Sequence, residues 1–141
     1  MRFNISPPAI VHTRKNGPDR WARARGPFVS LPYHSSPHQL PHELHHVRQW
    51  WAITVISAIL LASLHLFVPA VPYHVAGLSV GVFGALYFVS KSFRFWAEVG
   101  AYRVSAYVQP KRIGQFAKML YGYNTGRTLA QCRKAIEGLH R

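Results

Sequence analysis

A short histidine-rich segment carries the residues best suited to chemistry. Residues 42–46 read HELHH and match the pattern H-E-x-x-H. On a helix, His42 and His46 lie one turn apart and present two nitrogens to a zinc ion, with Glu43 as the general base. The pattern therefore indicates a zinc protease as one function for the chain.

Several features of the sequence weigh against that interpretation. The segment is rich in histidine, so a five-residue match arises easily by chance. Pro41 suits the first turn of a helix and would place the pattern there. A third ligand would have to be Glu98, Glu137 or a distant histidine, and no flanking motif of a zinc protease is present. We therefore expect no catalytic residue and no metal site, and interpret the histidines as interfacial groups that meet headgroups or a partner.

The element that must position these residues is a long apolar stretch. Gln49–Ser90 contains no Asp, Glu, Lys or Arg. A bilayer core about 30 Å thick needs roughly 20 apolar residues as a helix, so the stretch is long enough for two helices. Pro69 and Pro72 predict a turn in its middle. We expect an all-α membrane protein whose transmembrane hairpin has a first helix over 41–68, a turn over 69–72 and a second helix over 73–108 that extends beyond the membrane.

The second helix of this hairpin carries a row of small residues. Gly77, Gly81 and Ala85 follow one another at four-residue spacing. Such a row lets another backbone approach closely, so we expect helix packing there. The first helix is expected to supply one side of the contact and a partner protein the other.

Three further side chains could bind or react. His65 and His74 flank the turn and could be axial ligands of a haem or chlorophyll, since histidines within a membrane call for a functional hypothesis. We favour contact with water or headgroups. Cys132 is the only cysteine, and we expect it to pack on the apolar stripe of the last helix in an amphipathic helical tail over 110–141. Thr128 and Gln131 are expected to form a capping box at the start of that helix. No cofactor is expected, and a structural phospholipid such as cardiolipin is the alternative.

The charges lie on both sides of the apolar stretch. The chain has 17 Lys and Arg against 4 Asp and Glu, a formal net charge of +13. Seven basic residues precede the stretch and ten follow it, while the turn has none. The positive-inside rule then places both termini on the same side, the matrix or cytoplasm. Expected contacts with anionic lipid or a partner at this interface are Arg48, Trp50, Trp51, Lys91 and Arg94.

Residues 1–40 have the composition of an extended arm. Prolines, glycines and arginines recur without helical or strand periodicity. Such a segment has no core of its own, so we expect a partner surface to order it. We also expect that no leader has been removed from it. The expected anchors are basic and aromatic side chains: Arg14, Lys15, Arg20, Trp21, Arg23, Arg25, Phe28 and Tyr33.

In architecture the chain resembles the supernumerary, or accessory, subunits of mitochondrial respiratory complexes. The shared features are small size, basic character, an extended arm, one or two membrane helices and short amphipathic tails. The resemblance implies a non-catalytic role in stabilising an inner-membrane complex, with both termini in the matrix. NADH:ubiquinone oxidoreductase (complex I) is the first expectation, followed by ATP synthase, cytochrome oxidase and the bc1 complex.

The charge leaves one other class open. A net charge of +13 is compatible with nucleic acid, as in a mitoribosomal protein lying against the membrane. We expect no nucleic acid partner, because the basic residues flank a membrane hairpin and so act in topology and lipid contact.

Overall fold

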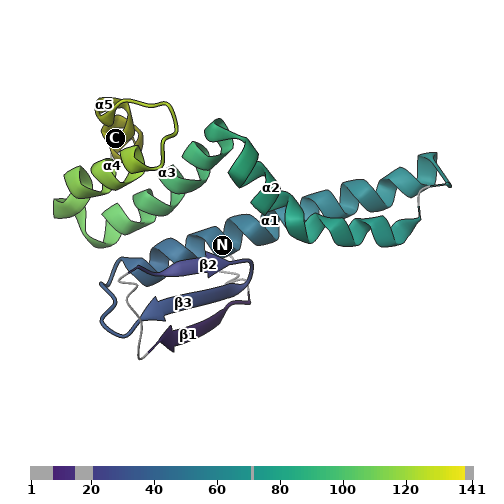
Figure 1. Cartoon of the computed structure of the whole chain (residues 1–141), viewed down its shortest axis with the longest axis horizontal. Helices are drawn as coiled ribbons and strands as arrows, with labels where there is room; N and C mark the ends of the chain where they lie inside the picture. The colour runs from purple at the N-terminus through teal and green to yellow at the C-terminus, as the bar shows by residue number, and fades with distance from the viewer. Residues whose placement is uncertain (1–7, 15–20, 71, 139–141) are drawn as a thin grey trace, which may run out of the picture.

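The computed structural model of the 141-residue chain describes residues 8–14, 21–70 and 72–138. The protein is mostly helical, with 69% helix, and has one small sheet near its N-terminal end (Figure 1). In the described part, the strands are β1 (Ile10–Arg14), β2 (Arg23–Arg25) and β3 (Phe28–Pro32), and the helices are α1 (Gln39–Phe67), α2 (Ser79–Val89), α3 (Lys91–Val108), α4 (Ile113–Gly122) and α5 (Leu129–Glu137). Two 3-10 helices, η1 (Tyr73–Leu78) and η2 (Pro110–Arg112), precede α2 and α4.

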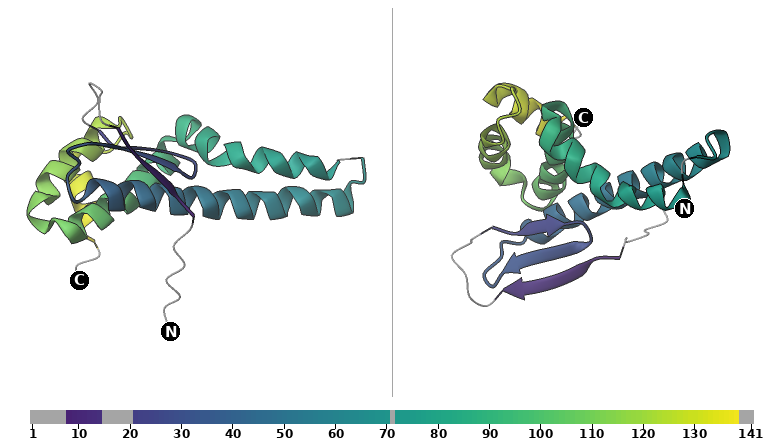
Figure 2. Two further views of the ribbon diagram at one scale, coloured as in Figure 1. Left: turned by 90° about the horizontal axis from the view of Figure 1, so that it is seen from below. Right: turned by 45° about the vertical axis from the view of Figure 1, so that its right-hand side comes forward.

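The apolar stretch folds into a helical hairpin. The 29-residue α1 is its first arm, and η1 and α2 run back along the C-terminal half of α1 (Figure 1 and Figure 2). α1 ends just before Pro69, as the prolines predict. Among the described residues, α1 is the one helix that is by itself long and apolar enough to cross a membrane.

The prediction of one continuous helix over 73–108 is wrong. α2 and α3 meet at Ser90 with a bend of 102° between the helical segments on either side of it. Ser90 has extended backbone angles, and its hydroxyl accepts from the N–H of Phe93, which caps the start of α3. Arg94 donates to the carbonyl oxygens of Tyr87 and Phe88, each at 2.9 Å, and so satisfies the end of α2. Side-chain caps on both sides stabilise the break.

Residues 1–40 do not form an extended arm without a core, so that prediction is also wrong for the part the structure describes. β3 pairs with β1 in parallel and with β2 in antiparallel orientation. Val29 and Leu31 are 1% and 6% exposed and pack against Val47 of α1. The strands are short, and Gly26, with φ of 60°, makes the turn between β2 and β3. The chain's own helix therefore orders this segment.

The last helices form a small bundle against α3. Tyr102 from α3, Phe116 and Leu120 from α4, and Cys132 and Ile136 from α5 make up its core, and all are at most 5% exposed. The predicted capping box at the start of α5 is confirmed by both of its hydrogen bonds. The amphipathic tail and the packing of Cys132 are thus confirmed.

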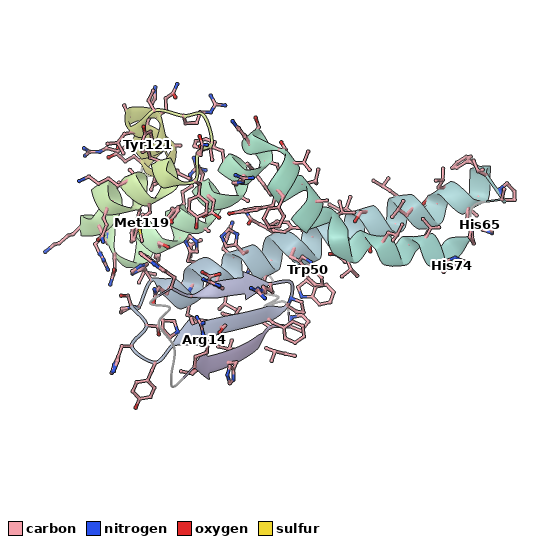
Figure 3. The ribbon with its side chains drawn as sticks, in the orientation of Figure 1. Arg14, Trp50, His65, His74, Met119 and Tyr121 are labelled. Atoms are coloured by element: carbon pink, nitrogen blue, oxygen red, sulfur yellow. The ribbon has the colours of Figure 1, made fainter. Side chains whose placement is uncertain are left out.

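The hairpin presents apolar side chains to its surroundings. Phe67 and Phe88 are 83% and 77% exposed, and Val89 is 86% exposed. In the most apolar window of α1, only 11% of the residues are buried. His65 and His74 lie at the far tip of this hairpin (Figure 3). A core helix of a soluble protein would be mostly buried.

Candidate metal centre

Helices α1 and α3 bring three metal-ligand side chains together. His42 and His46 lie one turn apart on α1, and Glu98 faces them from α3. One ligand atom from each residue lies within 4.8 Å of the other two. His42 Nε2 is 3.7 Å from Glu98 Oε2, and His46 Nε2 is 3.5 Å from Glu98 Oε1. We call these three residues the His–Glu cluster.

Small residues on α3 allow this approach. Ala97 and Ala101 are fully buried. A Cβ atom on Gly100 would lie 2.5 Å from Nε2 of His45 and 3.1 Å from Nε2 of Gln49. A larger side chain at position 100 would therefore displace α1 side chains beside the cluster.

A hydrogen-bond chain sets the tautomer of His46. Gln49 Nε2 donates to the carbonyl oxygen of Ala97 at 3.1 Å, which leaves Gln49 Oε1 to accept from Nδ1 of His46 at 3.0 Å. The Nδ1 atom therefore carries the proton, and Nε2 directs a lone pair at the carboxylate. This is the arrangement of metal-binding histidines, whose second nitrogen donates to a fixed acceptor.

His42 is oriented in the same way. Its Nδ1 lies 3.2 Å from Oγ of Ser105, and that hydroxyl in turn donates to the carbonyl oxygen of Ala101 at 3.2 Å. Burial lowers the pKa of His42 well below its usual value and that of His46 to about 4. Both residues precede the charge-free stretch and are covered by protein. Their imidazoles are neutral near pH 7, which is the form that binds metal.

Glu98 is a buried carboxylate with one oxygen unsatisfied. It is 2% exposed. Tyr87 donates to Oε1 at 2.5 Å, while Oε2 has no hydrogen-bond partner in the described structure. Burial raises the pKa of Glu98 to about 7, partly offset by hydrogen bonds from Tyr87 and Tyr123. Two imidazole lone pairs directed at a carboxylate repel it unless a cation or a proton lies between them.

Glu43 lies beside the cluster without belonging to it. It is about 60° from His46 around the helix axis, so both face the same side of α1. Glu43 is 8% exposed and accepts a hydrogen bond from the backbone N–H of Ala24 on β2. Burial, and then the charge of Glu98, raise the pKa of Glu43 to about 7. A carboxylate with such a pKa is suited to accept and return a proton.

A cavity of about 630 Å³ adjoins these groups. Glu43 and all three residues of the His–Glu cluster contribute to its lining. β2 and its turn form one wall, and α2 forms another with Val80, Gly81, Phe83, Gly84, Tyr87 and Phe88. The cluster therefore has an open side that a small molecule or a peptide can reach.

The donor set and its spacing fit zinc. Bonds of 2.0–2.1 Å around a tetrahedral ion place neighbouring ligand atoms about 3.4 Å apart. The two nitrogen–oxygen distances of 3.5 Å and 3.7 Å are close to this value, although they end at different oxygens of Glu98, and with one ligand atom per residue the three atoms lie within 4.8 Å of one another. Two imidazoles and a carboxylate with an open fourth position are typical of catalytic zinc sites, whereas structural sites are closed by four protein ligands. The His–Glu cluster is therefore a candidate zinc site, in contrast to the expectation from the sequence that there is none.

The residues expected at the membrane interface lie around the same region. Arg48 and Lys91 are exposed. Trp50 Nε1 donates to the carbonyl oxygen of Val80, and Trp51 Nε1 to that of Pro8, each at 3.1 Å. Both tryptophans therefore bind the chain's own backbone, and their contact with lipid stays a prediction. Trp50 lies where the hairpin meets the sheet (Figure 3).

The predicted packing of the small-residue row on the first helix is wrong. A Cβ atom added to Gly77, Gly81 or Gly84 meets no atom within 4 Å, and Ala85 is exposed. The glycines therefore do not pack on α1, and Gly81 instead borders the cavity that Trp50 of α1 also lines. The packing of the row on a partner stays a prediction.

The expected arm anchors are divided between several environments. Lys15 and Arg20 lie outside the described residues. Arg14 donates to the carbonyl oxygen of Trp21 at 3.0 Å. Arg23 and Arg25 border the cavity. The aromatic anchors are all more than half exposed: Trp21, Phe28 and Tyr33.

Several residues around the cluster have no signal in the sequence. Glu98 is one of the three options that the sequence leaves for a third ligand, whereas Gln49, Ser105 and Tyr87 are not predicted at all. The contacts of Gln49 and Ser105 join positions 48 and 63 residues apart. No local pattern could reveal such partners. Comparison with protein families, curated proteins and solved structures found no match to this chain.

Proposed function

We propose that the protein is a membrane-anchored, zinc-dependent hydrolase that cleaves peptide bonds. The observation that supports this proposal is the convergence of Glu98 with the two histidines of the H-E-x-x-H pattern. Two ligands at this spacing arise easily by chance. A buried third ligand at 3.5 Å and 3.7 Å from the nitrogens of these two oriented imidazoles arises by chance much less easily.

The residues of the chain divide into ligands and a proton carrier. His42, His46 and Glu98 would hold the ion, which supplies a Lewis acid that polarises a carbonyl and activates water. Glu43 takes the proton of the attacking water and passes it to the departing amine as the C–N bond breaks. The hydroxyl of Tyr87 holds the carboxylate of Glu98 in place. The products are a carboxylic acid and an amine, with one water consumed.

The membrane anchor is the helical hairpin. We propose that η1–α2 and the part of α1 that follows Gln49 lie in the bilayer, and that the sheet, the His–Glu cluster and the C-terminal bundle lie on one side of it. The supporting observation is the exposed apolar surface, with 11% of the α1 window buried. The basic residues on both sides of the hairpin favour the same orientation.

The test is zinc stoichiometry together with hydrolysis. Full-length protein in lipid nanodiscs, loaded with Zn²⁺, should bind one ion per chain and cleave a fluorogenic peptide mixture. Glu43→Gln should keep the zinc and lower hydrolysis by about 10²–10⁴-fold, as removal of a general base does. Glu137→Gln is the matched control, because Glu137 is partly exposed, lies outside the cluster and pairs with Arg133 at 2.8 Å. Failure to bind zinc would refute the proposal.

The interpretation as an accessory subunit of a respiratory complex stays a prediction. The open small-residue row and the exposed hairpin are compatible with a partner in the membrane. That role gives no reason, however, for a buried carboxylate directed at two imidazole lone pairs. Migration of the chain with a respiratory complex on a native gel of mild-detergent membranes would support the accessory role.

A further inference from the structure

We propose that the substrate is a polypeptide anchored in the same membrane, whose backbone emerges along α2 and enters the cavity between α2 and β2. This inference rests on the proposed function and adds the substrate class. The zinc cluster alone would serve a soluble peptide equally well. The shape and surroundings of the cavity are what distinguish a membrane-anchored chain.

The cavity lies at the junction of membrane and water. Trp50 and Phe88 line it from the two arms of the hairpin, whereas Arg23 and Arg25 line it from β2. Tryptophan beside cations marks the level of the headgroups. One end of the cavity is therefore continuous with the apolar hairpin and the other with the basic sheet.

The wall formed by α2 is open because of two glycines. Gly81 and Gly84 line the cavity, and a Cβ atom on either meets nothing within 4 Å. The uncovered space is therefore real and is not filled by neighbouring side chains. It leads from α2 to Glu98, which lines the same cavity and whose buried Oε2 has no hydrogen-bond partner among the described residues. A substrate polypeptide that lies along this wall would therefore extend to the His–Glu cluster.

The opposite wall favours a peptide backbone over a lipid tail. The turn at Gly26 joins Arg25 to Phe28, so these two residues form the hydrogen-bonded pair that closes the hairpin. In an antiparallel pair the next residue, Ala24, directs its N–H and C=O away from β3. β2 is one of the two edge strands, and the bond from Ala24 N–H to Glu43 is consistent with this direction. The N–H of Ala24 is thus taken by Glu43, and its outward carbonyl oxygen is left to accept from the backbone N–H of an extended polypeptide, a donor that an acyl chain lacks.

The test measures binding, so that it does not depend on turnover. The probe is a synthetic peptide with one apolar span, followed by an extended polar segment that carries a fluorophore. Its affinity is measured for zinc-loaded Glu43→Gln protein in nanodiscs. Adding Gly81→Leu should weaken binding at least tenfold, because the leucine occupies the space beside the cluster. Ala85→Leu is the matched control on the same helix; Ala85 is exposed and does not line the cavity.

The outcomes separate this inference from the proposed function. Equal binding by the Gly81→Leu and Ala85→Leu proteins would overturn the inference, even if zinc binding and cleavage of soluble peptides persist. Equal affinity for the same polar segment without its span would also overturn it. A fluorescent phospholipid in place of the peptide tests the other occupant, and Gly81-dependent binding of that lipid with none of the peptide would refute a polypeptide substrate. Zinc content of each variant shows that the cluster is intact.

Discussion

His46 and Glu98 face each other across two helices, with Nε2 of the imidazole 3.5 Å from Oε1 of the carboxylate. The other nitrogen of the same ring is held by Gln49. The ring therefore cannot turn away from Glu98 without breaking its hydrogen bond to Gln49. This relationship makes the cluster a preformed ligand set, and its consequences can be measured.

The first prediction concerns the ligands. Substituting His46→Ala or Glu98→Gln should abolish stoichiometric zinc binding, because each removes one of three protein ligands. The loss should exceed the roughly 10–100-fold that removal of an outer hydrogen-bond partner produces. Competition with a chromophoric chelator measures it. His74→Ala is the control, since His74 lies at the far tip of the hairpin (Figure 3), and it should leave the affinity unchanged.

A second prediction concerns the positioning residues Gln49 and Ser105. Gln49→Leu and Ser105→Ala should each weaken zinc binding by about 10–100-fold without changing the stoichiometry at saturation. Both substitutions remove the acceptor that fixes an Nδ1 proton. Gln49→Glu should restore only part of the affinity, because its carboxylate accepts from Nδ1 of His46 but cannot donate to the carbonyl oxygen of Ala97. Affinities of both variants equal to wild type would mean that the tautomers do not depend on these bonds.

Gly100 provides a third prediction, on the packing of α3 against α1. Gly100→Ala should destabilise the protein by about 1–3 kcal/mol, because the added Cβ would overlap His45 and press on Gln49. Gly114→Ala is the matched control on α4, where a Cβ meets nothing within 4 Å. That control should stabilise the helix by about 0.5–1 kcal/mol. Chemical denaturation of the protein in detergent compares the two.

Cys132 allows a fourth prediction, on the C-terminal bundle. Its side chain is fully buried and burial raises its pKa, so alkylation at pH 7.5 should be slow until the bundle opens. Leu120→Ala should destabilise the bundle by about 2–5 kcal/mol and speed alkylation accordingly. Because the chain has one cysteine, the modified fraction follows directly from mass spectrometry. Rapid alkylation of the wild-type protein would contradict the packing.

The last prediction concerns topology. Tags at both termini should be protected or digested together in sealed vesicles, because both flanks are basic and the turn is neutral. A tag inserted between Pro69 and Pro72 should show the opposite accessibility. Opposite behaviour of the two terminal tags would refute the hairpin in the membrane.

The sequence predicts the parts of the fold that depend on local chemistry. The charge-free stretch with its prolines predicts the hairpin, and Thr128 and Gln131 predict the cap of α5. The break at Ser90 escapes prediction because it depends on Arg94 binding the carbonyl groups of residues seven and six positions earlier. The sheet escapes because its strands have three to five residues, too few for a clear periodicity.

In the candidate site, too, the sequence predicts what is local and misses what depends on distant contacts. His42 and His46 are recognisable as a pair, since one helix holds both at fixed spacing. Whether the pair has a partner depends on how α3 packs on α1, which no local pattern encodes. Glu98 is therefore only one of several options in the sequence. The same argument applies to β2, whose free edge becomes relevant only because the sheet packs on α1.

The bend of 102° at Ser90 also bears on the distance between Glu98 and the membrane surface. If α2 crosses the bilayer, α3 must run close to the plane of its surface, and Glu98 is carried at a constant level above the lipid. His42 and His46 continue directly from the first arm of the hairpin, with no linker between them and the membrane. The two histidines and Glu98 can then not change their distances from the membrane independently of each other. If the protein is the zinc hydrolase that we propose, it would cut anchored chains at a set distance from the lipid surface, largely whatever their sequence.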